Sequence, residues 1–202
     1  MNDVGHGLDI LLDVDGVIYP FPELFTPWLA ARLDRPLELD TTAWAFYACW
    51  GLDDEDFLGH LVAGVREQDL WWTGDPYPDV VATFDRLHER GHRIHLVTAR
   101  DVAGPEAGLA ATEHWLAANE LEVDSVNLAQ DKPTVLERLD LDVSTCVAVD
   151  DGPHHVDAWE RAGVYGVVMN RWGSYQGDHR CVSDLTGFAD HLDDLRRLRP
   201  AS

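Results

Sequence analysis

The sequence predicts an α/β fold in which helices cover both faces of a parallel sheet, with a small, mostly helical segment inserted after the first strand. Short aliphatic runs alternate with longer segments that carry an apolar stripe at helical spacing, which is the pattern of βαβ units. From about Val17 to Tyr77 this alternation stops, because the stretch holds helix formers and aromatic residues but no clear strand. We therefore expect a catalytic core made of residues 1–16 and 78–202, and a helical cap made of residues 17–77.

Five aliphatic runs are expected to form buried strands. They contain few polar residues, as strands do when helices cover both faces of a sheet. In chain order they are Leu8–Leu12, RIHLVTA at 93–99, VDSVNLA at 123–129, TCVAVD at 145–150 and VYGVVMN at 164–170.

The segments between these runs are expected to be helical. Glycine and proline mark several of their ends, because glycine often follows the last helical turn and proline suits the first. The expected helices are Val80–Arg90, Gly108–Asn119, a short helix from Pro133, HHVDAWERAG at 154–163, and one or two turns within Asp184–Leu198.

Composition narrows the classes of partner. The chain has 202 residues and a formal charge of −22, which disfavours binding to long nucleic acids and to anionic membranes. No apolar run approaches the roughly 18 residues of a membrane helix, and the N-terminal residues lack the features of a signal peptide. The three cysteines stand at scattered spacings that suit a reducing cytosol. We expect a cytoplasmic protein without a membrane partner and leave its oligomeric state open.

Polar residues follow the ends of four expected strands. In a parallel sheet such groups gather at the carboxyl edge, where α/β proteins bind their ligands. Single members are also ordinary helix caps, but capping does not account for paired aspartates and a lysine together. The lysine is distinctive because the other 14 basic residues are all arginine. The set comprises Asp13, Asp15, Thr98, Lys132, Asp150 and Asp151.

Four carboxylates at one cleft would repel one another or take up protons unless a cation neutralised them. Mg²⁺ is the expected cofactor, because hard divalent ions prefer oxygen ligands. Zinc is disfavoured, since no His or Cys spacing here makes a tetrahedral site. His154 and His155 follow the last aspartate closely but are expected at a helix start or on the rim of the cleft.

These residues carry a family resemblance. The sequence D-x-D-G-V at 13–17, Thr98 after a hydrophobic strand, Lys132, and the Asp-Asp pair at 150–151 together resemble the four ordered motifs of the haloacid dehalogenase (HAD) superfamily. The resemblance implies a Rossmann-like core with a small cap inserted between the first two motifs. It also implies a hydrolase that forms a covalent intermediate on the first aspartate.

The resemblance assigns a role to each motif residue. Asp13 would be the nucleophile on Mg²⁺, forming an aspartyl-phosphate, and Asp15 would protonate the leaving group, deprotonate water and bind the metal through its backbone carbonyl. Thr98, Ala99 and Lys132 would hold the phosphoryl group. The acidic pair would complete the metal site, with strand alignment favouring Asp151 over Asp150 as the direct ligand. An aspartate at the second position indicates a phosphohydrolase, because dehalogenases lack an acid there and transport ATPases carry threonine.

The expected cap is rich in aromatic residues, which either form its own core or face the cleft and stack on a nucleobase. Phe21 and Phe25 are best placed by sequence to roof the site. Arg100 is expected near the phosphate, and Arg171 with Trp172 could line the rim. The arrangement resembles the deoxyribonucleotidase branch and points to a small phosphorylated metabolite such as a nucleoside monophosphate.

Two other functions fit the same sequence. One is a polynucleotide-end phosphatase, since a strand end could enter the cleft even though the acidic surface disfavours long nucleic acid. The other is a non-catalytic protein of the same fold that binds phosphorylated ligands. The second predicts damage to the motif residues, and none is seen.

Overall fold

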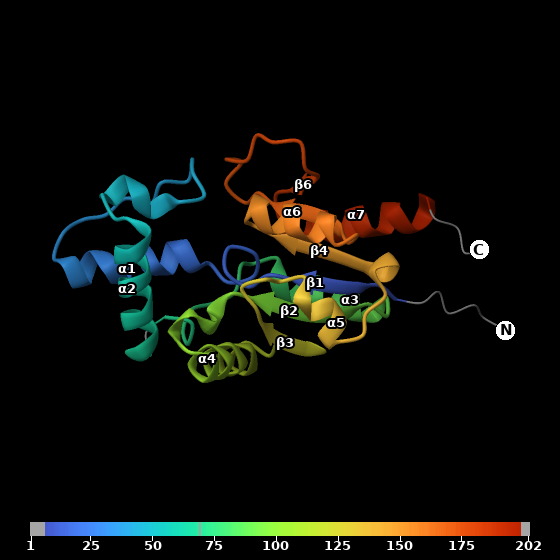
Figure 1. Cartoon of the computed structure of the whole chain (residues 1–202), viewed down its shortest axis with the longest axis horizontal. Coiled ribbons are helices and arrows are strands. Elements are labelled where there is room, and N and C mark those ends of the chain that lie inside the picture. The colour runs from blue at the N-terminus through green and yellow to red at the C-terminus, as the bar shows by residue number, and fades with distance from the viewer. Residues whose placement is uncertain (1–6, 69, 199–202) are drawn as a thin grey trace.

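The computed structural model describes residues 7–68 and 70–198 (Figure 1). In this part of the chain, six parallel strands form one sheet in the order β3-β2-β1-β4-β5-β6. The five predicted strands are confirmed, while β6 is a two-residue strand that no aliphatic run indicates. The strands are β1 (Asp9–Leu12), β2 (Arg93–Thr98), β3 (Ser125–Leu128), β4 (Cys146–Asp150), β5 (Tyr165–Met169) and β6 (Cys181–Val182).

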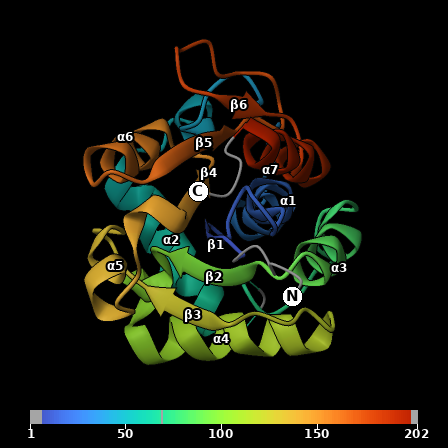
Figure 2. The same ribbon diagram turned by 90° about the vertical axis from the view of Figure 1, so that its right-hand side faces the viewer.

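Helices lie on both sides of this sheet, as predicted. Figure 2 shows α5 (Thr134–Arg138) and α6 (Pro153–Arg161) on one side and α3 (Val80–Glu89) and α7 (Leu185–Leu198) on the other. The fifth helix, α4 (Pro105–Ala118), lies beside β3. None of the helices in the described ranges is long and apolar enough to cross a membrane.

The central strand β1 shows why its sequence does not alternate between polar and apolar residues. Ile10 and Leu12 face a core cluster that includes Phe84 of α3, whereas Leu11 faces a second cluster that includes Trp159 of α6. Because both faces of β1 are covered, every residue of the strand is buried. The strand is thus held rigidly up to the point where Asp13 follows it.

Two local predictions differ from the structure. The C-terminal helix α7 has 14 residues rather than one or two turns. Leu185, Phe188 and Leu192 recur at helical spacing on α7 and are fully buried, so packing against α3 stabilises the whole helix. A short 3₁₀ turn, η2 (Arg100–Ala103), follows β2 before α4 begins. This turn was not predicted, and it determines where Arg100 points.

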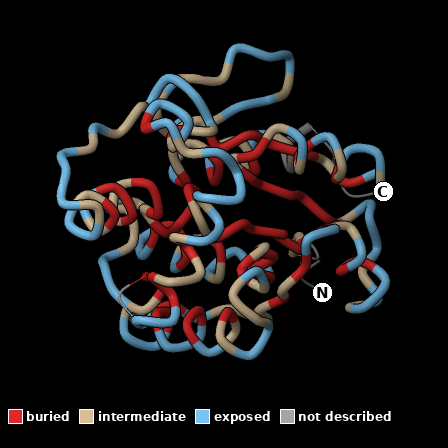
Figure 3. Tube along the Cα trace, turned by 60° about the vertical axis from the view of Figure 1, so that its left-hand side comes forward, coloured by how far each residue is buried: buried red, intermediate tan, exposed pale blue. Residues whose placement is uncertain are grey.

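The segment between β1 and α3 is helical, as the sequence indicates. It contains α1 (Phe21–Leu33), the 3₁₀ turn η1 (Phe46–Trp50) and α2 (Asp54–Arg66). Figure 1 shows α1 and α2 at one end of the sheet, and Figure 3 shows buried residues in red running through the interior of the molecule. Apolar residues of this segment belong to the same core cluster as those of β1. We call residues 17–77 the insertion; these bounds and the division into two domains stay a prediction.

Candidate active site

Three carboxylates meet where β1 and β4 end. The two strands pair with Leu12 opposite Val149, so the next residues, Asp13 and Asp150, lie side by side. Asp151 follows directly, and the three side chains each offer a carboxylate oxygen within 4.8 Å of the others. Asp13 and Asp150 are only 7% and 1% exposed. Strongly negative groups are therefore gathered in a place with little water to screen them.

Lys132 lies between two of these carboxylates. Its Nζ is 2.7 Å from Asp13 Oδ1 and 2.6 Å from Asp150 Oδ2, and the side chain is 2% exposed. Burial alone would lower the pKa of Lys132, but the two carboxylates outweigh it and raise the pKa above its usual value. The single lysine of the sequence is thus a permanent cation at the carboxyl edge of the sheet, in contact with Asp13 as predicted.

The remaining negative charge is only partly balanced. Burial raises the pKa of Asp13 to about 6, with Lys132 opposing the shift and Asp150 adding to it. Burial also raises the pKa of Asp151 well above its ordinary value, and the neighbouring Asp13 and Asp150 carboxylates add to that shift. One ammonium does not compensate three carboxylates, so the site favours a further cation or a proton.

Steric contact explains why glycine occupies the last position of the D-x-D-G sequence. Gly16 has a φ of +76°, and a Cβ added there would lie 2.3 Å from Asp151 Oδ2. Any larger residue would collide with this carboxylate and would also adopt a costly left-handed conformation. Glycine at position 16 therefore allows the loop after β1 to approach the acidic end of β4.

A pocket of about 360 Å³ adjoins these groups, and we call it the central pocket. Six of the predicted site residues line it together: Asp13, Asp15, Thr98, Ala99, Lys132 and Asp151. Much of the remaining lining is aromatic and comes mainly from the insertion, including Phe21, Trp44, Phe46, Tyr47, Phe57, Trp71 and Trp172. The structure thus joins the motif residues of the sheet edge to an aromatic wall.

The two neighbouring aspartates occupy different positions. Asp150 does not line the central pocket, and its oxygens accept hydrogen bonds from Lys132 Nζ and, at 3.0 Å, from the Gly152 amide. Asp151 lines the pocket, where the neighbouring Trp44 side chain partly opposes the rise in the pKa of its carboxyl. Asp151 is thus the one of the two that lines the pocket, and its role as the direct metal ligand stays a prediction.

Arg100 was expected to contact substrate, but the structure places it elsewhere. Its side chain is fully buried, it does not line the central pocket, and its guanidinium pairs with Asp15. The 3₁₀ turn after β2 directs the side chain behind Asp15 rather than toward the phosphate side of Thr98. The geometry therefore does not support Arg100 as a substrate contact.

The other predicted contacts divide in a similar way. Phe21 and Trp172 line the central pocket, whereas Phe25 is fully buried among aromatic rings of the insertion and does not line it. Arg171 donates hydrogen bonds to Asp79 and to a backbone carbonyl, and it lines a neighbouring pocket of about 350 Å³ instead. Phe25 therefore packs the interior of the insertion, whereas Arg171, which follows β5, bonds to Val17 at the start of the insertion and to Asp79 just after it.

Some pocket residues were not singled out from the sequence. Trp44 was one of many aromatic residues in the insertion, and nothing in its surroundings distinguished it. Phe57 stacks on Tyr47 with ring centroids 4.0 Å apart and also lines the pocket, which its sequence context does not indicate. An apolar position at helical spacing on α2 was the only available signal for Phe57, and such positions more often form a core.

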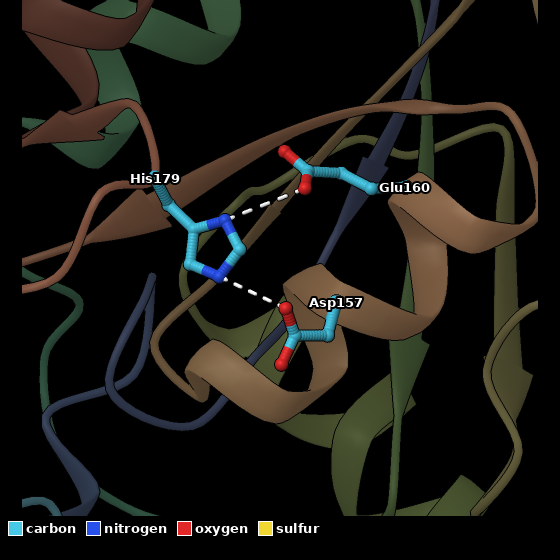
Figure 4. Close-up of side chains that lie close together, drawn as sticks. All are labelled: Asp157, Glu160 and His179. Atoms are coloured by element: carbon cyan, nitrogen blue, oxygen red, sulfur yellow. Dashed lines mark ion pairs between the residues drawn. The ribbon is translucent and has the colours of Figure 1, made fainter.

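A second group of potential metal ligands lies outside the central pocket (Figure 4). Asp157 and Glu160 project from α6, and His179 comes from the loop before β6. His179 Nε2 is 3.1 Å from Asp157 Oδ1, and His179 Nδ1 is 3.4 Å from Glu160 Oε2. Each ring nitrogen faces a different carboxylate of α6, so these contacts tie the loop before β6 to that helix. We assign the group a structural role.

Comparison with known proteins identifies the family. A family model described as haloacid dehalogenase-like hydrolase matches residues 10–163, which contain all four motifs. The match covers well over half of the chain, so this protein belongs to the haloacid dehalogenase-like hydrolases. No curated protein sequence matches the chain.

Solved structures support the fold. A phosphonoacetaldehyde hydrolase-like protein from Oleispira antarctica is 16% identical, with a TM-score of 0.63 over 96% of this chain and 94% of that one. A D,D-heptose 1,7-bisphosphate phosphatase from Burkholderia thailandensis is 19% identical, with a TM-score of 0.54 over 94% and 99%. An L-2-haloacid dehalogenase is 17% identical, with a TM-score of 0.58 over 92% and 99%. Their names include both a phosphatase and a dehalogenase, so the shared fold does not select between these activities.

Proposed function

We propose that this hydrolase is a Mg²⁺-dependent phosphatase that cleaves small phosphate monoesters through an aspartyl-phosphate on Asp13. The observation that carries the proposal is Asp15, which lines the central pocket two residues after Asp13. The alcohol of a phosphate ester leaves as a strong base that needs a proton, whereas a halide leaves without one. A carboxyl group at this place therefore supports a phosphatase rather than a dehalogenase.

The donor set fits the proposed metal. Asp13 and Asp151 both line the pocket, and burial together with repulsion from neighbouring carboxylates raises the pKa of each carboxyl. Oxygen donors with uncompensated negative charge suit Mg²⁺. We propose that these two carboxylates and the backbone carbonyl of Asp15 hold the ion, with Asp150 directly behind them. When bound, Mg²⁺ would neutralise the carboxylates and the phosphoryl oxygens.

The side chains of the pocket would carry out two steps. In the first, an oxygen of Asp13 attacks phosphorus, the bond to the ester oxygen breaks, and Asp15 gives that oxygen its proton. In the second, Asp15 takes a proton from water, the resulting hydroxide attacks phosphorus, and the bond to Asp13 breaks to release phosphate. Thr98 would orient the phosphoryl oxygens, and Lys132 would balance the charge on Asp13 throughout.

The lining of the pocket supports a nucleotidase-like substrate class. Among the described residues that line it, Lys132 is the only one with a permanent positive charge. A bisphosphate, such as the Burkholderia enzyme is named for, would therefore lack a cation for its second phosphate. The aromatic side chains instead suit a planar, uncharged leaving group, since base–aromatic stacking contributes about 1–3 kcal/mol per base. We propose a nucleoside monophosphate, consistent with the resemblance to deoxyribonucleotidases.

Phosphate release from a panel of esters tests the proposal. The panel contains p-nitrophenyl phosphate, nucleoside and deoxynucleoside monophosphates, sugar phosphates, a bisphosphate and a haloacid. We expect turnover of the aryl and nucleoside esters with Mg²⁺, and loss of turnover with a chelator or in Asp13→Asn. Turnover of the haloacid alone would contradict the proposal, as would no turnover of any phosphate ester.

The same panel separates the two alternative functions. A polynucleotide-end phosphatase would release phosphate faster from a phosphorylated oligonucleotide end than from the matching monophosphate. A non-catalytic binding protein would retain phosphorylated ligands without releasing phosphate from them. Either result would replace the proposed function.

A further inference from the structure

Arg100 is a buried cation that the proposed reaction does not yet use. Its Nε donates to Asp15 Oδ2 at 2.9 Å, and its Nη2 donates to Asp15 Oδ1 at 2.8 Å. The Arg100 side chain is 0% exposed, whereas that of Asp15 is 26% exposed. Such a forked pair fixes the plane of a carboxylate. Each oxygen keeps a further lone pair, so Asp15 can still exchange a proton on its pocket side.

The guanidinium is itself anchored by α4. Its Nη1 donates to Thr112 Oγ1 at 3.2 Å, and Thr112 Oγ1 donates to the Gly108 carbonyl at 2.8 Å. A Cβ added at Gly108 would lie 2.1 Å from the Arg100 carbonyl oxygen. Glycine therefore allows α4 to pack directly against the turn that carries Arg100, and the cation has little freedom to move.

The insertion joins the core through two connections, one near Tyr19 after β1 and the other near Trp71 before α3. An aromatic ring from each connection contacts Arg100. Its guanidinium carbon lies 4.7 Å from the ring centroid of Tyr19, which follows β1, and 5.0 Å from that of Trp71, which precedes α3. The Tyr19 hydroxyl donates to the Thr73 carbonyl at 3.0 Å and accepts the Trp71 amide at 3.1 Å. One hydroxyl thus joins the two connections, and both rings make cation–π contacts with the same arginine.

The conformation and burial of Trp71 are energetically unfavourable. It has a φ of +66°, which is unfavourable for a bulky side chain. Its indole N–H is buried and has no hydrogen-bond partner among the residues that the structure describes. Strain and unsatisfied polar groups of this kind are concentrated at functional sites. Packing and the contact with Arg100 hold Trp71 in this conformation.

We propose that Arg100 is a positioning residue, which holds Asp15 in place for proton transfer and links it to the two connections of the insertion. This inference rests on the proposed function, because it assumes that Asp15 protonates the leaving group. Arg100 itself touches neither the pocket nor the reacting atoms. Replacing Arg100 should therefore lower kcat/KM most for esters whose leaving group needs a proton, and least for esters whose leaving group does not.

The dependence of kcat/KM on the leaving group tests the inference. Two substrates of similar size are compared with Mg²⁺: dinitrophenyl phosphate, whose phenolate leaves without a proton, and phenylethyl phosphate, whose alkoxide needs one. General acid catalysis is worth about 10²–10⁴-fold. We expect Arg100→Lys, which keeps the charge but loses the fork, to lower kcat/KM for the alkyl ester about 30-fold or more, and for the aryl ester less than about 3-fold.

Three further variants make the result specific. Asp15→Asn should also lower kcat/KM selectively for the alkyl ester, and by the whole contribution of general acid catalysis, about 10²–10⁴-fold. Tyr19→Phe, which removes only the hydroxyl between the connections, should lower the alkyl-to-aryl ratio about 3-fold, as a partial displacement of Asp15 would. Arg86→Lys is the matched control, because Arg86 bridges Asp190 and Asp193 between α3 and α7 and should leave the ratio unchanged.

The outcomes are distinct. If folded Arg100→Lys loses kcat/KM equally on both esters, or on neither, Arg100 has no positioning role. If Tyr19→Phe leaves the alkyl-to-aryl ratio of kcat/KM unchanged, Arg100 does not link Asp15 to the connections. If Arg100→Lys does not fold, Tyr19→Phe and Thr112→Val, each lacking one hydroxyl, carry the same test of the ratio. Wild-type protein that hydrolyses neither ester would instead overturn the proposed function itself.

Discussion

Replacing Lys132 by methionine tests the charge balance at the centre of the site. In the wild type, Nζ lies 2.7 Å from Asp13 Oδ1 and 2.6 Å from Asp150 Oδ2 in a nearly solvent-free position. Methionine fills a similar volume without charge, so two buried carboxylates lose their shared partner. Removing one partner of a buried ion pair costs about 3–5 kcal/mol. We expect the free energy of unfolding of the metal-free protein to fall by this amount at pH 8.

The size of this loss depends on pH. Burial raises the pKa of Asp13 to about 6 in the wild type, and removal of Lys132 raises it further. Because the folded-state pKa lies above the unfolded value, the folded protein binds the extra proton as the pH falls, and stability is regained on acidification. One proton taken up over two pH units is worth about 2.7 kcal/mol. The deficit of Lys132→Met should therefore shrink by up to that amount between pH 8 and pH 6.

Urea denaturation with EDTA at the two pH values measures this difference through tryptophan fluorescence. Arg86→Met is the control, because the Arg86 side chain is 29% exposed and its ion pairs should contribute about 1 kcal/mol or less, with little change between pH 8 and pH 6. If Lys132→Met has the same free energy of unfolding as the wild type at pH 8, the reasoning is refuted. A deficit that is the same at pH 8 and pH 6 would refute it as well.

Three further predictions concern the metal, the aromatic wall and the outer ion pairs. Mg²⁺ should raise the melting temperature of the wild type more at pH 8 than at pH 5, because protons compete for Asp13 and Asp151; thermal melts of Asp13→Asn should show little of this effect. Trp44→Ala should raise KM for a nucleoside monophosphate about 10-fold, as expected for one lost stacking contact, and KM for a small alkyl phosphate less than about 2-fold; equal changes would count against stacking. His179→Gln should lower the free energy of unfolding by about 1 kcal/mol or less and leave the bound metal, measured by elemental analysis, unchanged; loss of a metal ion would show that Figure 4 depicts a metal site.

Much of the fold and the centre of the site could be predicted from local sequence. Each main strand is an uninterrupted aliphatic run, and the parallel sheet then brings the residue after each run to one edge. Asp13, Lys132 and Asp150 lie far apart in the sequence, yet they are within hydrogen-bonding distance in the structure. Strand order and register explain this contact without any knowledge of side-chain conformations.

The parts that were missed depend on side-chain direction and on irregular backbone. Arg100 stands two residues after Thr98, but the 3₁₀ turn sends its side chain behind Asp15 instead of into the pocket. Trp44 precedes η1 in a stretch with no helical or strand period, so the sequence gives no face on which to place it. β6 is too short to produce a pattern. In each case tertiary packing determines a position that local spacing does not.

The two aspartates of the D-x-D segment are held by different cations, Asp13 by Lys132 and Asp15 by Arg100. Both aspartates have a buried cationic partner, but the partners differ in kind. The compact ammonium of Lys132 contacts Oδ1 of Asp13, and in the proposed reaction this leaves the other oxygen of Asp13 to attack phosphorus. The planar guanidinium of Arg100 engages both oxygens of Asp15, and in the proposed reaction this keeps Asp15 in one orientation while it exchanges a proton. Exchanging the two cations would give each aspartate the wrong constraint. This is a physical reason for one lysine among 14 arginines, and for its place beside the proposed nucleophile.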